Sequence, residues 1–355
     1  MDDHTGPGHD PEVLDETYLR LHATGPEFEG WLSNHGPMAA DAMIRLGCGA
    51  EVERWVGGYA RRLHHAPAPR WEIEEDEWRE VLGDPSRLGD WTALFERLLR
   101  EEPWRDVLVR WWPRLIDGAI ASATHGLIRT GHAVRALLET PTAPRRAELA
   151  HALGYWAARH QRLPVHPRPF GAADAAAALD AVPVIETSGG IRTRLDDLAR
   201  TPSWPATVAR LHATPPAAEV PAALDALVDA AVTHYQHWAH AKPVMLVHAA
   251  TAPRAAGLVL PALPAHLWAQ TYEVSWAAAA AISTIYRPST PPPPSTRSEQ
   301  RILTPEQVAE RAVGSGDEHA IKFAEVVSES HRRGNPDAVS AGARAVHLIA
   351  PVEDD

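Results

Sequence analysis

The sequence predicts a mainly α-helical fold, with 1–355 forming a single domain, on three observations. Apolar residues recur at helical spacing, helix start signals precede several of these segments, and the period-two alternation of half-buried strands is scarce. A chain of 355 residues is long enough for one large domain. The clearest predicted helices are 37–47, 50–63, 91–99, 144–161 and 221–238.

Two helix starts are marked by a threonine shortly before a proline. Thr142 precedes Pro144, and Thr304 precedes Pro305 with an acid close behind, which is typical of the first turn of a helix. One apolar segment differs from this pattern. The composition of residues 244–247 is compatible with a β-strand or with a buried extended segment.

A proline-rich segment at 287–299 interrupts the helical pattern. Its run of four prolines favours polyproline II and is incompatible with the interior of a helix. We therefore expect a linker between residues 1–286 and a C-terminal group of helices at 300–350.

Charge and cysteine content exclude several classes of function. The formal net charge of −12 argues against nucleic-acid and anionic-membrane partners. The single cysteine, Cys48, allows no intrachain disulfide and no zinc or iron–sulfur site built from cysteines. Cysteine use of this kind fits a reducing cytoplasm.

The sequence predicts neither a secretion signal nor a membrane-spanning helix. The first residues, 1–7, are acidic and lack an apolar core, so we expect no secretion signal. The most apolar stretches, 258–263 and 277–281, are too short or too weakly apolar to span a membrane. We therefore expect a cytoplasmic protein.

The most informative run is 317–323, where His319 and Lys322 lie three positions apart and share a helical face. An ammonium group has no lone pair to give a metal. A carboxylated lysine is a carbamate, whose anionic oxygen can bind one. The run therefore has two interpretations. It is either half of a metal centre, or a helix that carries a hydrogen-bonded histidine and a solvated lysine.

Histidine is unusually frequent, with 20 in the chain, and three segments carry further candidates. His35 lies at a helix entrance, where it either points inward or serves as a turn residue. His248 ends the apolar run at 244–247 and is either functional or packed. His125 and His132 share a helical face two turns apart, roughly 10.5 Å. That span is long for one ion, so we expect one to bind metal and the other to support it.

Arg129 lies between His125 and His132 on the same face. It either meets an anionic substrate or pairs with an acid across the core. Nucleotide-binding and hydrolase motifs are missing from the sequence: there is no G-x-G-x-x-G after a strand, no P-loop and no G-x-S-x-G elbow. Strand–helix alternation is missing too, which argues against a Rossmann domain holding flavin or nicotinamide.

Five segments, in their order and spacing, resemble the questin oxidase-like family, and the resemblance runs from about residue 14 to about residue 345. The segments are 31–39 (WLSNHGPMA), 43–47 (MIRLG), 125–132 (HGLIRTGH), 247–251 (VHAAT) and 317–322 (DEHAIK). Arg129 departs from the family pattern, which often has histidine there in fungal members. The chain is also shorter than those members.

The resemblance implies an enzyme of secondary metabolism that opens the quinone ring of an anthraquinone-type aromatic polyketide. Members are labelled Baeyer–Villiger-like and NADPH-dependent, while others look like non-haem iron dioxygenases that hold iron with histidines and a carboxylated lysine. Carried over by position, the implied ligands are His35, His125, His248, His319 and Lys322.

Physical chemistry favours iron over flavin. Imidazole and carboxylate-like oxygen suit Fe(II), and a carbamate supplies the negative charge that four neutral imidazoles lack. Carbamate formation needs a neutral amine. Lys322 must therefore be desolvated or metal-assisted, because the usual lysine pKa is roughly 10.4.

The leading hypothesis is an Fe(II)- and O2-dependent oxygenase, of the dioxygenase type, that cleaves a C–C bond in a reduced anthraquinone. In this hypothesis His132 takes the phenol proton, Arg129 contacts substrate, and Trp31 forms an apolar wall unless it packs in the core. The alternatives are a Baeyer–Villiger-type monooxygenase using NADPH and a non-enzymatic helical binding protein.

Overall fold

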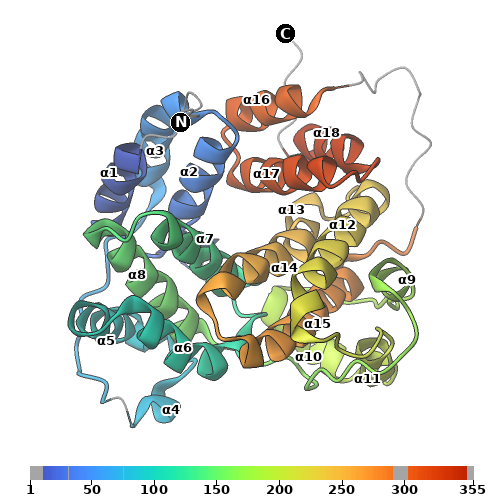
Figure 1. Ribbon diagram of the computed structural model, residues 1–355, viewed down its shortest axis with the longest axis horizontal. Helices are drawn as coiled ribbons and strands as arrows, with labels where there is room; N and C mark the ends of the chain where they lie inside the picture. The colour runs from blue at the N-terminus through green and yellow to red at the C-terminus, as the bar shows by residue number, and fades with distance from the viewer. Residues whose placement is uncertain (1–10, 31, 75, 291–302, 350–355) are drawn as a thin grey trace.

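Helices make up most of this protein, as the computed structural model shows (Figure 1). The structure describes residues 11–30, 32–74, 76–290 and 303–349. The prediction of a mainly α-helical fold is confirmed. The strands in the described residues are one short antiparallel pair, in which Glu27 lies opposite Ser33.

The elements follow one another as short helices joined by tight turns. The α-helices are α1 (Pro11–His22), α2 (Gly36–Arg45), α3 (Val52–Tyr59), α4 (Trp78–Val81), α5 (Leu88–Glu101), α6 (Trp104–Leu115), α7 (His125–Glu139), α8 (Ala143–Arg159), α9 (Ala175–Asp180), α10 (Ile191–Ala199), α11 (Trp204–Ala209), α12 (Val220–Trp238), α13 (Pro243–Leu246), α14 (His248–Val259), α15 (Trp268–Tyr286), α16 (Pro305–Ser315), α17 (Glu318–Arg332) and α18 (Ala338–Ile349). The strands and 3₁₀ turns are β1 (Glu27–Phe28), β2 (Leu32–Ser33), η1 (Gly49–Glu51), η2 (Ala60–Arg62), η3 (Pro85–Arg87), η4 (Ile116–Gly118), η5 (Ala217–Glu219), η6 (Leu260–Ala262) and η7 (Ala265–Leu267).

All five helices predicted from periodicity are present, although the one at 50–63 is divided into η1, α3 and η2. Both predicted starts are confirmed. The side chain of Thr142 accepts a hydrogen bond from the backbone N–H of Arg145. Thr304 and Gln307 form a capping box at the start of α16.

The expected strand or extended segment at 244–247 is wrong. Pro243 begins the short helix α13, and α14 begins at His248. Proline fixes a backbone angle suited to the first helical turn. Leu246 and Val247 are buried, and α13 contacts α12, α14, α15 and α18. Packing against helices on several sides therefore overrides the local β preference.

Helix α15 lies at the centre of the fold and is apolar around its circumference. Residues 274–286 are all buried, including a run of alanines that lets neighbouring helices approach closely. Buried indoles find acceptors here: Trp112 donates to Thr271 at 2.9 Å and Trp276 donates to the Val208 carbonyl at 2.8 Å. These tryptophans belong to the core.

Four helices from distant parts of the sequence pack in a closed ring: α2 contacts α7, α7 contacts α14, α14 contacts α17, and α17 contacts α2 (Figure 1). Gly131 lets α7 and α14 meet, because a Cβ there would lie 2.6 Å from the Ala255 carbonyl oxygen. The C-terminal helices expected at 300–350 are present as α16–α18, and α17 completes the ring. The proline run of the expected linker lies outside the described residues.

A network of buried charges joins the same four helices. Arg135 of α7 pairs with Asp41 of α2 and with Glu325 of α17. Arg254 of α14 donates to Glu325 at 3.0 Å, and His132 lies 2.8 Å from Asp41. Burial alone would raise the pKa of Glu325, but the two arginines lower it to about 2.

One segment, Pro243–Ala262, has the length and composition of a membrane span, which the sequence analysis did not anticipate. In the fold, 72% of its most apolar window is buried inside the protein. A core helix of a globular protein passes the same test, and α14 packs against α7, α12 and α15 in this way.

Replacing Glu325 with alanine should destabilise the fold strongly, because two buried arginines lose their shared carboxylate. We expect the free energy of unfolding in urea to fall by about 1.5–3 kcal/mol, since Arg135 keeps Asp41 and Arg254 keeps Glu329. Glu310→Ala, on the exposed face of α16, is the matched control and should change it by less than about 0.5 kcal/mol. Equal effects of the two variants would contradict the assigned role of the network.

The network should also make stability depend on acid pH. The pKa of Glu325 is about 2 in the fold against 4.5 in the unfolded chain. Its contribution is therefore complete above pH 4.5 and is lost as pH falls toward 2. The difference in unfolding free energy between the wild type and Glu325→Gln, followed by circular dichroism, should shrink over that window. A constant difference from pH 6 to pH 3 would argue against the depressed pKa.

Candidate metal centre

Four histidines meet where the N-terminal ends of α2, α7, α14 and α17 converge. His35 is the N-cap of α2, and His125 and His248 are the first residues of α7 and α14. His319 is the second residue of α17. The imidazole centroids are 4.4 Å apart for His35 and His125, 4.6 Å for His35 and His319, and 4.6 Å for His125 and His248.

The ring nitrogens are close enough to share one ion. One nitrogen from each of His35, His125 and His319 lies within 4.8 Å of the other two. The Nε2 atoms of His35 and His125 are 2.6 Å apart. Two imidazole nitrogens at this distance either share a proton or direct both lone pairs at a cation. The ring of His248 lies 5.6 Å from that of His319 and closes the group.

The tautomer of His125 is set by its backbone surroundings. Its Nδ1 lies against the carbonyl oxygen of Ser122, so Nδ1 carries the proton and donates it. The Nε2 lone pair then faces the other histidines, as in a metal ligand oriented by a second hydrogen bond. Likewise, Nδ1 of His248 lies 3.3 Å from the hydroxyl of Thr124.

Strained backbone leads into α7 at this point. Ser122, Ala123 and Thr124 have φ angles of 47°, 54° and 71°, three successive non-glycine residues in the left-handed region. Such conformations cost on the order of 1 kcal/mol or more each and persist where the surrounding structure imposes them. Here the strain brings the Ser122 carbonyl under Nδ1 of His125 and the Thr124 hydroxyl beside His248.

The backbone of His35 is held from two sides. Its N–H donates to the hydroxyl of Tyr59 at 2.7 Å. The Asn34 side chain accepts from the N–H of Gly36 at 2.9 Å. Gly36 packs closely here, since a Cβ at this position would lie 2.8 Å from a terminal methyl group of Leu21, which would have to shift.

Lys322 is buried next to this group, with 1% of its surface exposed. Its Nζ has no hydrogen-bond partner in the described part of the chain. Burial lowers the pKa of the amine to about 8, although Glu318 and Asp317 oppose that shift. A buried, unpaired amine with this pKa is partly neutral near neutral pH, which is the form that carbamate formation needs.

Three of the histidines, His35, His125 and His248, are neutral at physiological pH. Burial lowers the pKa of His35, His125 and His248 well below the usual value, and the charge of Lys322 lowers it further. Neutral imidazole is the form that ligates metals. Because four helix N-termini also direct positive potential at this point, an anionic group there is stabilised.

Two acids that the sequence analysis quoted but did not assign contribute to the site. Asp317 caps α17 by accepting the N–H groups of His319 at 2.8 Å and Ala320 at 3.2 Å. Glu318 lies 3.5 Å from Nδ1 of His35, an atom otherwise without a hydrogen-bond partner. The sequence signal that could have identified these acids is an acidic residue directly before a histidine in the first turn of a helix.

A cavity of about 630 Å³ opens onto the histidines, and all four line it. Its volume lies within the range of small-molecule sites, about 300–1,000 Å³. The lining of the cavity also includes apolar and aromatic side chains. They are Phe28, Leu32, Ile191, Val244, Met245 and Tyr286.

The structure places the remaining candidates elsewhere. Arg129 is buried and forms two hydrogen bonds with Glu148, at 2.6 and 2.8 Å. It therefore pairs with an acid across the core, and its assignment to substrate is corrected. His132 belongs to the ion network through Asp41, and the described lining of the cavity does not include it. Its expected role as proton acceptor is likewise corrected. Trp31 lies outside the described residues.

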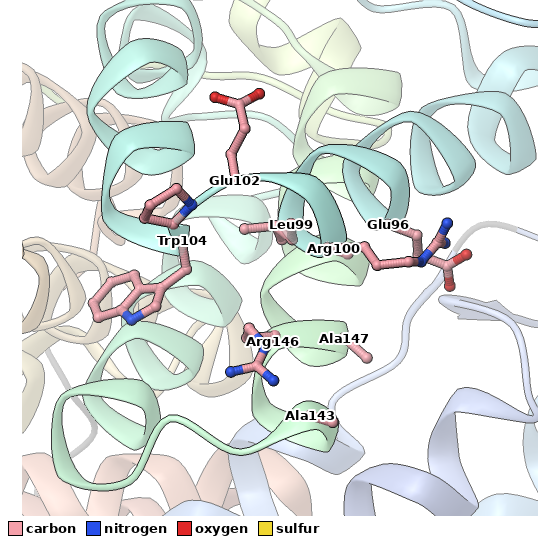
Figure 2. Close-up of a pocket in the computed structure, with 10 residues that line it drawn as sticks. Glu96, Leu99, Arg100, Glu102, Trp104, Ala143, Arg146 and Ala147 are labelled. Carbon is pink, nitrogen blue, oxygen red and sulfur yellow. The ribbon is translucent and has the colours of Figure 1, made fainter.

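Figure 2 shows a second hollow, of about 470 Å³, between α5 and α8. The carboxylates of Glu96 and Glu102 point in different directions there. Glu102 is paired with Arg110 at 2.7 and 2.8 Å. Since the donors in this hollow do not converge, the histidine-lined cavity is the stronger candidate site.

No model of a known protein family matches this chain, and no curated protein matches it. The functional argument therefore depends on the chemistry of the site itself.

Adding Fe(II) anaerobically, or Co(II) as a spectroscopic substitute, should raise the melting temperature. At about 100 times the dissociation constant, one bound ion adds roughly 2.7 kcal/mol of stability. His319→Ala should abolish this gain and leave helical circular dichroism largely intact. His237→Ala, an exposed histidine at the end of α12, is the control and should keep it. Unchanged metal occupancy in His319→Ala would exclude that ligand.

Proposed function

We propose that this protein is a non-haem Fe(II)-dependent oxygenase that cleaves a C–C bond of a reduced anthraquinone or related aromatic polyketide. The observation that carries the proposal is the convergence of four histidines from four helices, three of them buried and His319 partly exposed, beside one unpaired, buried lysine amine. The five residues are those implied by the resemblance to questin oxidase-like enzymes. In keeping with the lone cysteine, we place the reaction in the cytoplasm.

The donor set suits iron. Neutral imidazoles together with one anionic oxygen ligand are a set that Fe(II) accepts. When bound, the iron supplies activation of O2. The anionic oxygen comes from Lys322: its neutral amine adds to CO2, a C–N bond forms, and one proton leaves to solvent. The helix N-termini around the site stabilise the resulting negative charge.

The cavity supplies binding and exclusion of water. Its apolar wall suits a flat polycyclic substrate, with Phe28 and Tyr286 offering aromatic surfaces. The histidines line the same cavity, so a ring bound there lies near the proposed metal position. Holding the two reactants in this geometry lowers the entropic part of the barrier.

Replacing Lys322 tests the carbamate. After equilibration with ¹³CO2, the wild type should show a carbamate carbon signal that Lys322→Ala lacks. Lys242 is the other lysine in the sequence, and Lys242→Ala is the matched control that should keep the signal. Iron content should fall at least about tenfold in Lys322→Ala, in line with the loss of a ligand, and short carboxylates should partly restore it. A signal that survives in Lys322→Ala would rule out the carbamate there.

Turnover tests the activity itself. The iron-loaded protein is mixed with a chemically reduced hydroxyanthraquinone under ¹⁸O2, without NADPH, and products are analysed by mass spectrometry. We expect a ring-opened product carrying two ¹⁸O atoms, and no product when a chelator has removed the metal. Turnover that requires NADPH and not iron would favour the Baeyer–Villiger alternative. Metal binding without any turnover would favour a binding protein.

A further inference from the structure

The cavity that opens onto the histidines is lined by more positive than negative side chains. This contrasts with the formal net charge of −12 for the whole chain. The basic residues in its lining are Arg62, Arg159, Arg192, Arg194 and Lys242. The acidic residues in its described lining are Asp317 and Glu318.

Two of the cations and both acids already have partners. Arg159 binds Glu27 through two hydrogen bonds of 2.6 Å. Arg62 lies 3.5 Å from Glu318, which also faces His35. Asp317 accepts backbone N–H groups at the start of α17. None of these groups is available to balance the charges that remain.

Three cations form no ion pair with a carboxylate in the described part of the chain, although a longer-range attraction links Arg194 to Asp197 of the same helix. Arg194 is held in place by the carbonyls of Gly189 at 2.8 Å and Thr187 at 2.9 Å. Its guanidinium lies 5.0 Å from the ring centroid of Tyr286, which lines the same cavity. Arg192 and Lys242 are exposed, and no ion pair engages either within the described residues.

The two lysines of the sequence differ in their relation to the cavity. Lys322 is buried beside the histidines, and Lys242 lies in the lining of the cavity that they share. Arginine is far more frequent in this chain, so a lysine at this position is notable. The free-energy cost of an exposed, unpaired ammonium is small. The ammonium is stabilised most when an anion binds beside it in the cavity.

We propose that the substrate is an aromatic molecule carrying an anionic oxygen group, a carboxylate or an ionised phenol, which Arg192, Arg194 and Lys242 bind. This inference rests on the proposed function and narrows its substrate class. Guanidinium binds carboxylate oxygens in a fixed geometry. Anchoring the anionic group among the cations fixes which ring edge faces the histidines. The positive lining also attracts an anionic molecule to an otherwise acidic protein.

A pair of probes that differ only in charge tests this inference without turnover. Anthraquinone-2-carboxylate and its neutral primary amide are titrated into the full-length, metal-free protein by isothermal calorimetry. The carboxylate should bind about tenfold more tightly at low salt, because charge-assisted hydrogen bonds are stronger than neutral ones. The difference should narrow as salt is raised.

The double variant Arg192→Gln/Lys242→Gln should remove most of the preference and leave binding of the amide unchanged. Its control, Arg311→Gln/Arg332→Gln, makes the same change in net charge at exposed positions on α16 and α17, and should keep the preference. Equal affinities for the two probes, or a preference that survives in the double variant, would overturn the anionic substrate and leave the oxygenase proposal standing. Binding of neither probe would count against both.

Discussion

The rest of the structure depends on the buried charges that join α2, α7, α14 and α17. Arg135, Asp41, Glu325 and Arg254 come from four separate helices, and each has partners on others. Removing Glu325 takes away the carboxylate that Arg135 and Arg254 share, in surroundings largely shielded from water, which is why such networks impose one arrangement of the helices. The positions of the histidines at the N-terminal ends of these helices are therefore set by the same arrangement of helices.

The same arrangement creates an electrostatic problem at the histidines. Four helix N-termini direct positive potential at one point, and Lys322 adds a buried amine without a partner. Burial keeps the imidazoles of His35, His125 and His248 neutral, and an imidazole carries no negative charge that could offset a metal's charge. A carbamate on Lys322 would place negative charge beside the helix N-termini. The anionic group of the proposed substrate would place negative charge among Arg192, Arg194 and Lys242, in the same cavity.

Local pattern in the sequence predicted five of the helices and left the role of each histidine open, and the family resemblance selected the four histidines that converge. It could not assign Arg129 or His132, because their roles are set by Glu148 and Asp41, which other helices bring to them. The prediction of a strand or extended segment at 244–247 was also wrong, because packing against neighbouring helices outweighs the local β preference. The positive lining of the cavity was beyond prediction, since its residues are scattered from 62 to 242 and only the fold shows which of them already have acidic partners.

The segment Pro243–Ala262 has a consequence for how variants of this protein behave. It carries both His248 and Arg254, and it is the most membrane-like part of the described chain. In a molecule that has not finished folding, these twenty residues form an exposed hydrophobic surface that binds chaperones and other nascent chains. Substitutions that loosen α14 will therefore lower soluble yield in the producing cell before any defect in catalysis can be measured.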